Sequence, residues 1–154
     1  MRIGQIGLEK ESLRTDPQAN IAQSDHPLEL GAALTHPSIT TDYSEALLEF
    51  VTPPLADSEQ ALAFLDDIHR FVYPRIGVES LWPGSMPPRL AGEQSIRIAH
   101  YGSSNLGQMK EVYRRGLGYR YGKTMQVIAG IHVNLSIDEA FWPRWQALKD
   151  DQSE

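Results

Sequence analysis

MQVIAGIHVNLS, residues 125–136, is the stretch that decides the fold, because apolar and polar side chains alternate along it with a period of two. Side chains on a β-strand point to opposite faces in turn. One face of such a strand is entirely apolar: Met125, Val127, Ala129, Ile131, Val133 and Leu135. The other face is largely polar: Gln126, Ile128, Gly130, His132, Asn134 and Ser136. We therefore predict a strand whose apolar face lies in the core and whose polar face is the floor of a site.

Two more strands are predicted toward the N-terminus. Residues 4–14 (GQIGLEKESLR) predict a strand with Glu9 and Glu11 on the same face. Residues 39–53 (ITTDYSEALLEFVTP) are rich in threonine and apolar residues and also predict a strand, which ends at two prolines. Asp42 and Glu49 are an odd number of positions apart, so a turn or bulge near Ser44 is needed to bring both to one face.

Helices are predicted between these strands. Asp57 and Gln60 have the spacing of a capping box, which predicts a helix over residues 57–77. A second helix is predicted over residues 105–121, with apolar side chains at helical spacing: Leu106, Met109, Tyr113 and Leu117. Gly116 and Gly118 weaken that helix and indicate that another group packs close to its backbone.

A last helix is predicted after residue 136. Ser136 and Glu139 form a second capping box, and Pro143 is expected to disturb the helix that follows. Strands and helices do not alternate along the chain as in a parallel βαβ series. The predicted fold class is therefore α+β, with a mainly antiparallel sheet and flanking helices.

The composition is that of one globular domain. Of 154 residues, 41% are apolar and 22% charged, and the net charge of −6 argues against a nucleic-acid partner. No cysteine is present, which excludes disulfides, thiolate zinc sites and a cysteine nucleophile. The N-terminus lacks the pattern of a signal peptide, and no apolar run approaches the roughly 20 residues of a membrane helix. We expect a cytoplasmic protein with no membrane partner.

Four side chains are candidates for chemistry, and each has a simpler alternative. Glu9 and Glu11 are hard oxygen ligands that suit magnesium, but paired carboxylates are also common on exposed strands. Glu49 interrupts the apolar run ALLEFV, so it needs a cation, a hydrogen-bond partner or exposure on the far face. His132 is either a ligand or a hydrogen-bonded structural residue, and the remaining histidines lack the spacing of a zinc site.

Phosphate-binding signatures such as the Walker loop are absent. The segment GSSNLG, residues 102–107, offers either an anion site at a helix N-terminus or ordinary capping by Ser104 or Asn105. The helix after it carries basic and aromatic side chains that fit either a pocket for substrate carboxylates or an amphipathic surface: Tyr113, Arg114, Arg115, Tyr119, Arg120 and Tyr121.

Taken as text, the chain resembles the proteobacterial type of the glutamate–cysteine ligase family, whose members catalyse the first step of glutathione synthesis. The resemblance is carried by four stretches: IGLEKESLR at 6–14, HPLELGAALTHPSITTDYSEALLEFVTP at 26–53, LWPGSMP at 81–87, and IAHYGSSNLGQMKEVYRRGLGYRYGKTMQVIAGIHVNLS at 98–136. They occur in the family's order and spacing and cover nearly the whole chain.

The resemblance implies a partial glutamine-synthetase-like fold, in which ATP, magnesium and substrates meet over one sheet face. It places five residues on metal-ligand positions: Glu9, Glu11, Asp42, Glu49 and His132. Tyr113 and Leu117 match the cysteine pocket, and Gln126 and Ile128 match the pocket around the glutamyl group. It assigns no catalytic residue within this chain. The implied reaction joins the γ-carboxylate of L-glutamate to the amine of L-cysteine through a γ-glutamyl phosphate, with Mg²⁺ as cofactor and ATP as co-substrate.

The resemblance also implies that residues 1–154 are the N-terminal portion of a longer catalytic domain. The missing C-terminal half would then be a partner that supplies another metal-binding glutamate, substrate-binding arginines and much of the nucleotide site. We expect the isolated fragment to be inactive. Two other interpretations remain open: a non-catalytic module that binds magnesium or an amino acid, and a related carboxylate–amine ligase with another amine substrate.

Overall fold

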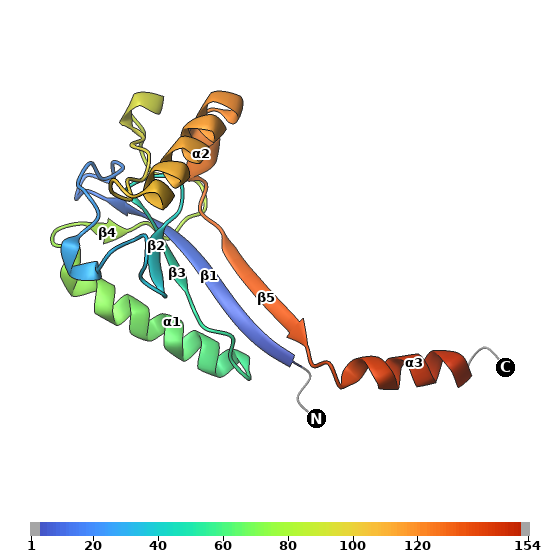
Figure 1. The fold of residues 1–154 in the computed structure, drawn as a ribbon. Coiled ribbons are helices and arrows are strands. Elements are labelled where there is room, and N and C mark those ends of the chain that lie inside the picture. The colour runs from blue at the N-terminus through green and yellow to red at the C-terminus, as the bar shows by residue number, and fades with distance from the viewer. Residues whose placement is uncertain (1–3, 152–154) are drawn as a thin grey trace.

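Residues 4–151 are described by a computed structural model, in which an antiparallel sheet is flanked by helices (Figure 1). The sheet has five strands: β1 (Gly4–Thr15), β2 (Ile39–Thr41), β3 (Leu47–Val51), β4 (Ser80–Leu81) and β5 (Ile131–Ile137). The longer helices are α1 (Ser58–Val72), α2 (Asn105–Tyr121) and α3 (Phe141–Asp151). The predicted α+β class with an antiparallel sheet is confirmed.

β1 is the central strand. Along one edge it pairs with β3, which in turn pairs with the short edge strand β2. Along its other edge, residues 4–10 pair with β5, and Arg14 and Thr15 pair with β4. β1 therefore pairs with a segment, β5, that is more than 100 residues away in the sequence.

Helix α1 covers one face of this sheet. Its buried side chains Ala61, Leu65, Ile68 and Val72 pack in one cluster with Leu8, Leu48 and Phe50 of the strands. Asp57 caps the helix as predicted, because its side chain accepts a hydrogen bond from the backbone N–H of Gln60. The helix ends at Val72, earlier than predicted, because Pro74 has no N–H with which to continue it.

Helix α2 has the predicted bounds, and Ser104 caps it by accepting from the backbone N–H of Gly107. Close packing against the helix backbone was predicted at Gly116 and Gly118, and the structure shows it only at Gly118. A Cβ on Gly118 would lie 2.5 Å from the Tyr43 hydroxyl, whereas one on Gly116 would meet only Arg120 at 3.6 Å. Gly118 therefore allows the tyrosine of the β2–β3 turn to pack against the helix.

The strand predicted over residues 125–136 forms only from Ile131. Thr124–Val127 is a 3-10 helix instead. The reason is that β4 already occupies this part of the β1 edge: the Trp82 N–H donates to the Leu13 carbonyl, and the Ala129 N–H donates to Ser85. Gly130 still accepts from the Glu11 N–H, but the residues before it have no free partner in β1.

The predicted core face of that strand is also wrong. Ile131 is 66% exposed and Leu135 is 76% exposed, and only Val127 and Ala129 of the alternating series are buried. Because Leu8 of β1 is opposite Val133, the apolar side of β5 is on the same sheet face as α1. Helix α1 packs over β1 and β3, which leaves that side of β5 open to solvent.

The last helix begins later than predicted. Ser136 stays in β5 opposite Gln5, so it does not cap a helix, and Asp138 instead accepts from the backbone N–H of Ala140. Pro143 lies in the first turn of α3, where its missing N–H costs nothing. Helix α3 extends away from the sheet (Figure 1), and none of its residues is buried. No helix within residues 4–151 is long and apolar enough to cross a membrane.

Candidate functional site: an acidic sheet face

The strand register brings four of the predicted site residues to one face of the sheet. Glu11 of β1 is directly opposite Glu49 of β3, and Glu9 is directly opposite His132 of β5. Directly opposed residues on paired strands point to the same face, and alternate residues on one strand do so too. The three carboxylates and the imidazole therefore share the face that α1 does not cover.

Asp42 reaches this group through the predicted turn. The segment 39–53 is a hairpin rather than one strand, and the backbone N–H of Leu47 donates to Ser44 at the turn. Helix α2 contributes to holding the turn, since the guanidinium of Arg114 donates to the Asp42 carbonyl. The carboxylate of Asp42 is close enough to raise the pKa of both Glu11 and Glu49.

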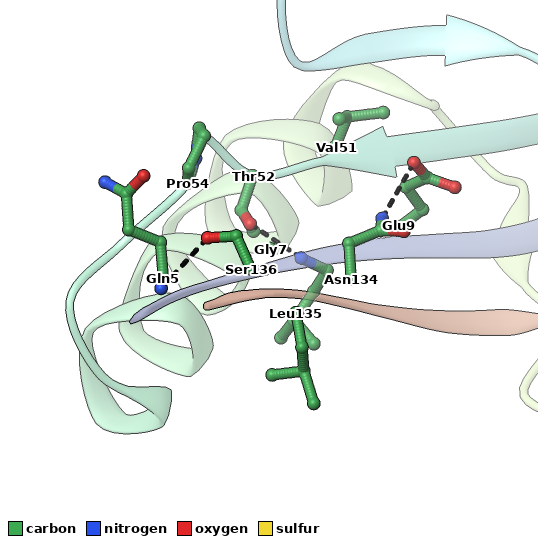
Figure 2. A pocket seen from close by; sticks show the side chains of 10 residues that line it. Gln5, Gly7, Glu9, Val51, Thr52, Pro54, Asn134, Leu135 and Ser136 are labelled. Carbon is green, nitrogen blue, oxygen red and sulfur yellow. Dashed lines mark hydrogen bonds between the residues drawn. The ribbon is translucent and has the colours of Figure 1, made fainter. Parts of the chain in front are cut away.

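β5 holds the two carboxylates of β1 in place. Glu9 contacts two side chains of β5. Its Oε2 is 3.1 Å from Nδ1 of His132. Its Oε1 accepts from the amide of Asn134 at 3.0 Å (Figure 2). Glu11 accepts from the backbone N–H of Gly130 at 2.7 Å. Three residues spaced two apart, in β5 and just before it, thus hold the carboxylates of β1: Gly130 binds Glu11, and His132 and Asn134 bind Glu9.

The face concentrates negative charge. Burial raises the pKa of Glu49 to about 7, and the nearby carboxylates of Asp42, Glu11 and Glu9 add to the rise. Burial also raises the pKa of Glu11, although the bond from Gly130 opposes this. The hydrogen bond to Glu9 raises the pKa of His132. Carboxylates under this much mutual repulsion are suited to a divalent cation, which would bind them in place of protons.

The donor set fits magnesium in chemical type, since it consists of carboxylate oxygens with one imidazole nitrogen. Within residues 4–151, no three acidic or histidine side chains already surround one point. Glu9 and Glu11 are instead held by the hydrogen bonds to β5. To surround a cation, these two carboxylates would have to exchange those hydrogen bonds for contacts with it.

A cavity of about 310 Å³ lies on the sheet next to Glu9 (Figure 2). The residues around it include the apolar Val51 and Pro54 and the polar Gln5, Thr52, Asn134 and Ser136. Thr52 and Ser136 use their hydroxyls to accept backbone N–H groups of β1, at 2.9 and 3.1 Å. The cavity thus borders the acidic face along the N-terminal half of β1.

The residues predicted for the amino-acid pockets lie near the other end of β1. Tyr113 is on α2 and is 61% exposed, while Leu117, one turn later, packs against the core cluster that contains Val127. Gln126 is in the 3-10 helix and Ile128 follows it, so neither shares a strand face with His132 as predicted. Leu117 thus lies where α2 contacts the 3-10 helix that contains Gln126, and none of the four residues lies within β5.

Three residues around the site were not predicted to have a role. Gly130 and Asn134 were placed on the polar face of the strand, and that alternation was the available signal, but their bonds to Glu11 and Glu9 depend on the register. Glu45 is a buried carboxylate whose two oxygens accept from the backbone N–H groups of His26 and His100. It stabilises the turn that carries Asp42.

Comparisons with known proteins point to one family. The glutamate–cysteine ligase family matches residues 1–154. A glutamate–cysteine ligase of Hahella chejuensis is 59% identical over 143 residues, which are 92% of this chain and 27% of that protein. One from Alcanivorax borkumensis is 54% identical over 96% of this chain and 28% of its own length. The chain therefore spans about a quarter of the curated relatives that it matches.

Solved structures give the same result. The glutamate–cysteine ligase of Francisella tularensis, in complex with AMP, has a TM-score of 0.90 and 41% identity, covering 96% of this chain and 30% of that one. A bifunctional glutathione synthetase from Pasteurella multocida has a TM-score of 0.85 and 33% identity, covering 96% of this chain and 19% of its own. The family match over the whole sequence and these likenesses lead to one conclusion: the chain belongs to the glutamate–cysteine ligase family.

Proposed function

We propose that this chain supplies the cation-binding sheet face of a glutamate–cysteine ligase active site. The observation that carries the proposal is the register that aligns Glu9, Glu11 and Glu49 with His132 on one face, in a chain matched by the family over its whole length. Asp42 completes the set from the adjoining turn. The proposed cation is Mg²⁺ and the proposed co-substrate is ATP.

The proposed reaction has two steps. The γ-carboxylate of glutamate attacks the γ-phosphorus of ATP, which forms γ-glutamyl phosphate and releases ADP. The amine of cysteine then attacks the acyl carbon, phosphate leaves, and the amine loses a proton. Bound magnesium would neutralise charge on the transferring phosphoryl group. The role of Glu9, Glu11 and Glu49 is to hold that cation, and His132 and Asn134 orient Glu9.

The order of features along β1 supports an arrangement of substrates. The 310 Å³ cavity borders Gln5 to Glu9, the carboxylates lie in the middle, and α2 lies beyond Leu13 at the other end. We therefore place the nucleotide over the cavity and the amino acids between the carboxylates and α2, near Tyr113, Leu117, Gln126 and Ile128. The AMP complex of the Francisella relative supports a nucleotide site in this fold.

The proposed activity needs more chain than these 154 residues. The relatives are roughly three and a half times as long, and this chain leaves the apolar side of β5 exposed and no residue of α3 buried. These surfaces fit a contact with the remaining part of the enzyme, since large exposed apolar patches usually mark an interface. We expect residues 1–154 alone to show no cysteine-dependent ATP hydrolysis.

A chimaera tests the proposal. Residues 1–154 replace the matching segment of the Hahella chejuensis relative, and the product is assayed for γ-glutamylcysteine with glutamate, cysteine, ATP and Mg²⁺. We expect turnover that requires cysteine, with little when alanine or another amine replaces it. Turnover with another amine in place of cysteine would favour the related carboxylate–amine ligase. A folded chimaera that binds Mn²⁺ but forms no product would instead favour a non-catalytic binding module.

A further inference from the structure

Gly130 directly precedes β5 and contacts both a carboxylate and the imidazole of the acidic face. Its N–H donates to Glu11 Oε2 at 2.7 Å, and its carbonyl accepts from the Glu11 N–H at 3.0 Å. A Cβ placed on Gly130 would lie 2.9 Å from Nε2 of His132 and 3.4 Å from its Cδ2. The imidazole thus occupies the space that a side chain on residue 130 would fill.

The backbone does not require glycine here. Gly130 is not one of the positive-φ glycines, a group that includes Gly102 and Gly122. Its φ is therefore negative, which is the range that L-residues in general adopt. The close contact is with the far end of a side chain rather than with backbone, so the ring and not the main chain would move.

The ring could not move without losing its contact with Glu9. Nδ1 of His132 is 3.1 Å from Glu9 Oε2, and the other oxygen of Glu9 is held by Asn134 at 3.0 Å. Because Asn134 holds Glu9 in place, a displaced ring would leave that carboxylate behind. Nε2 at present lies over Gly130, whose N–H binds Glu11, so displacement would also move this nitrogen away from Glu11.

We propose that Gly130 is a positioning residue, which keeps the His132 imidazole between Glu9 and Glu11 by having no side chain. The expected effect of Gly130 on cation binding rests on the proposed function of the acidic face, whereas its expected effect on the position of the His132 ring does not. Groups that orient metal ligands typically change metal affinity by about 10- to 100-fold when they are altered. Gly130→Ala should therefore weaken cation binding by at least about 10-fold while the fold remains intact.

The test compares residues 1–154 in four forms: wild type, Gly130→Ala, His132→Ala and the double variant. Gly116→Ala is the matched control, because a Cβ there meets only Arg120 at 3.6 Å. NMR cross-peaks between the His132 ring and the Glu9 Hγ protons report the ring position. The EPR signal of free Mn²⁺ reports affinity, and thermal melting reports folding.

We expect Gly130→Ala to lose the ring cross-peaks and to bind Mn²⁺ at least about 10-fold more weakly, with a melting temperature close to that of wild type. In the His132→Ala background, adding Gly130→Ala should change neither affinity nor melting temperature, because the ring that it displaces is absent. The control should match wild type in the cross-peaks and in affinity, and should melt no lower than wild type, because alanine favours a helix over glycine.

The outcomes separate the two proposals. If wild type fails to bind Mn²⁺, the proposed cation site is wrong, and the cross-peaks alone decide whether Gly130 positions the ring. Cross-peaks and affinity that survive Gly130→Ala would overturn the inference. An equal drop in melting temperature when Gly130→Ala is added to wild type and to His132→Ala would also overturn the inference, because the added methyl group would then clash with a group other than His132.

Discussion

Replacing Glu45 with alanine should destabilise the protein by about 3 kcal/mol. Glu45 is 5% exposed, and its carboxylate accepts from the backbone N–H groups of His26 at 2.9 Å and His100 at 2.8 Å. Hydrogen bonds to a charged group contribute about 1.5–3 kcal/mol each, which would total roughly 3–6 kcal/mol for two. A cavity of about 340 Å³ adjoins this carboxylate and lets water reach the freed N–H groups, so the lower end is expected.

Urea unfolding followed by tryptophan fluorescence measures this loss, which is a large fraction of the roughly 5–15 kcal/mol that stabilises a domain. Glu45→Gln keeps one acceptor oxygen and should lose about half as much, whereas Glu59→Ala, on the exposed side of α1, should change stability by less than about 0.5 kcal/mol. If Glu45→Ala stays within that last range, the carboxylate does not hold the two loops, and the argument is refuted.

The remaining predictions concern the acidic face, one buried histidine and the exposed strand. In the Hahella chimaera, Glu49→Gln should lower turnover by about 100-fold or more, since it removes a charged ligand, and unchanged turnover would contradict the cation site. Burial, and then the Arg14 charge, lower the pKa of His26. The contribution of neutral His26 to stability is therefore present above the unfolded-state pKa of about 6.5 and is lost as pH falls through the folded-state pKa. Urea midpoints between pH 7 and 5 should therefore fall more steeply for wild type than for His26→Phe, and equal slopes would oppose this. The side chain of Leu135 is 76% exposed, so Leu135→Lys should reduce self-association in size-exclusion chromatography and change stability by less than about 0.5 kcal/mol. A loss of stability above about 2 kcal/mol would mean that this face of β5 is covered.

Local signals were sufficient to predict the elements whose ends are set within a few residues. Helix α2 was predicted from the helical spacing of its apolar side chains, and its ends agree with local features: Ser104 caps its start, and Gly122, with φ of 77°, follows its end. The start of α1 was predicted from Asp57 for the same reason. The strand predicted over residues 4–14 is confirmed as β1, which extends one residue further, to Thr15.

The errors arose where a distant segment decides the outcome. Alternation continues through residues 125–130, but β4 occupies the edge of β1 with which this segment would have to pair. A strand as short as β4, with only two residues, has no recognisable pattern in the sequence from which this pairing could be predicted. The apolar face of β5 was predicted to be buried, yet a period of two shows only that a strand has two different faces. It does not show which of them another element covers.

For the site, too, local spacing was predictable from the sequence and distant pairing was not. Glu9 and Glu11 share a face by their spacing alone. The alignment of His132 with Glu9 depends on pairing between residues 123 positions apart, which the family resemblance implied and the register now provides. Gly130 had no visible role in the sequence, because its importance lies in the space that the imidazole occupies.

The most direct test of the central claim, that this face binds a divalent cation, is anomalous diffraction from crystals of residues 1–154 grown with Mn²⁺. The account predicts one strong anomalous peak on the sheet face, about 2.0–2.4 Å from carboxylate oxygens of Glu9, Glu11 and Glu49, near Asp42 and His132. Loss of the peak in crystals of Glu49→Gln would strengthen the assignment. Ordered carboxylates with no peak at saturating Mn²⁺, or a peak confined to another surface, would contradict it.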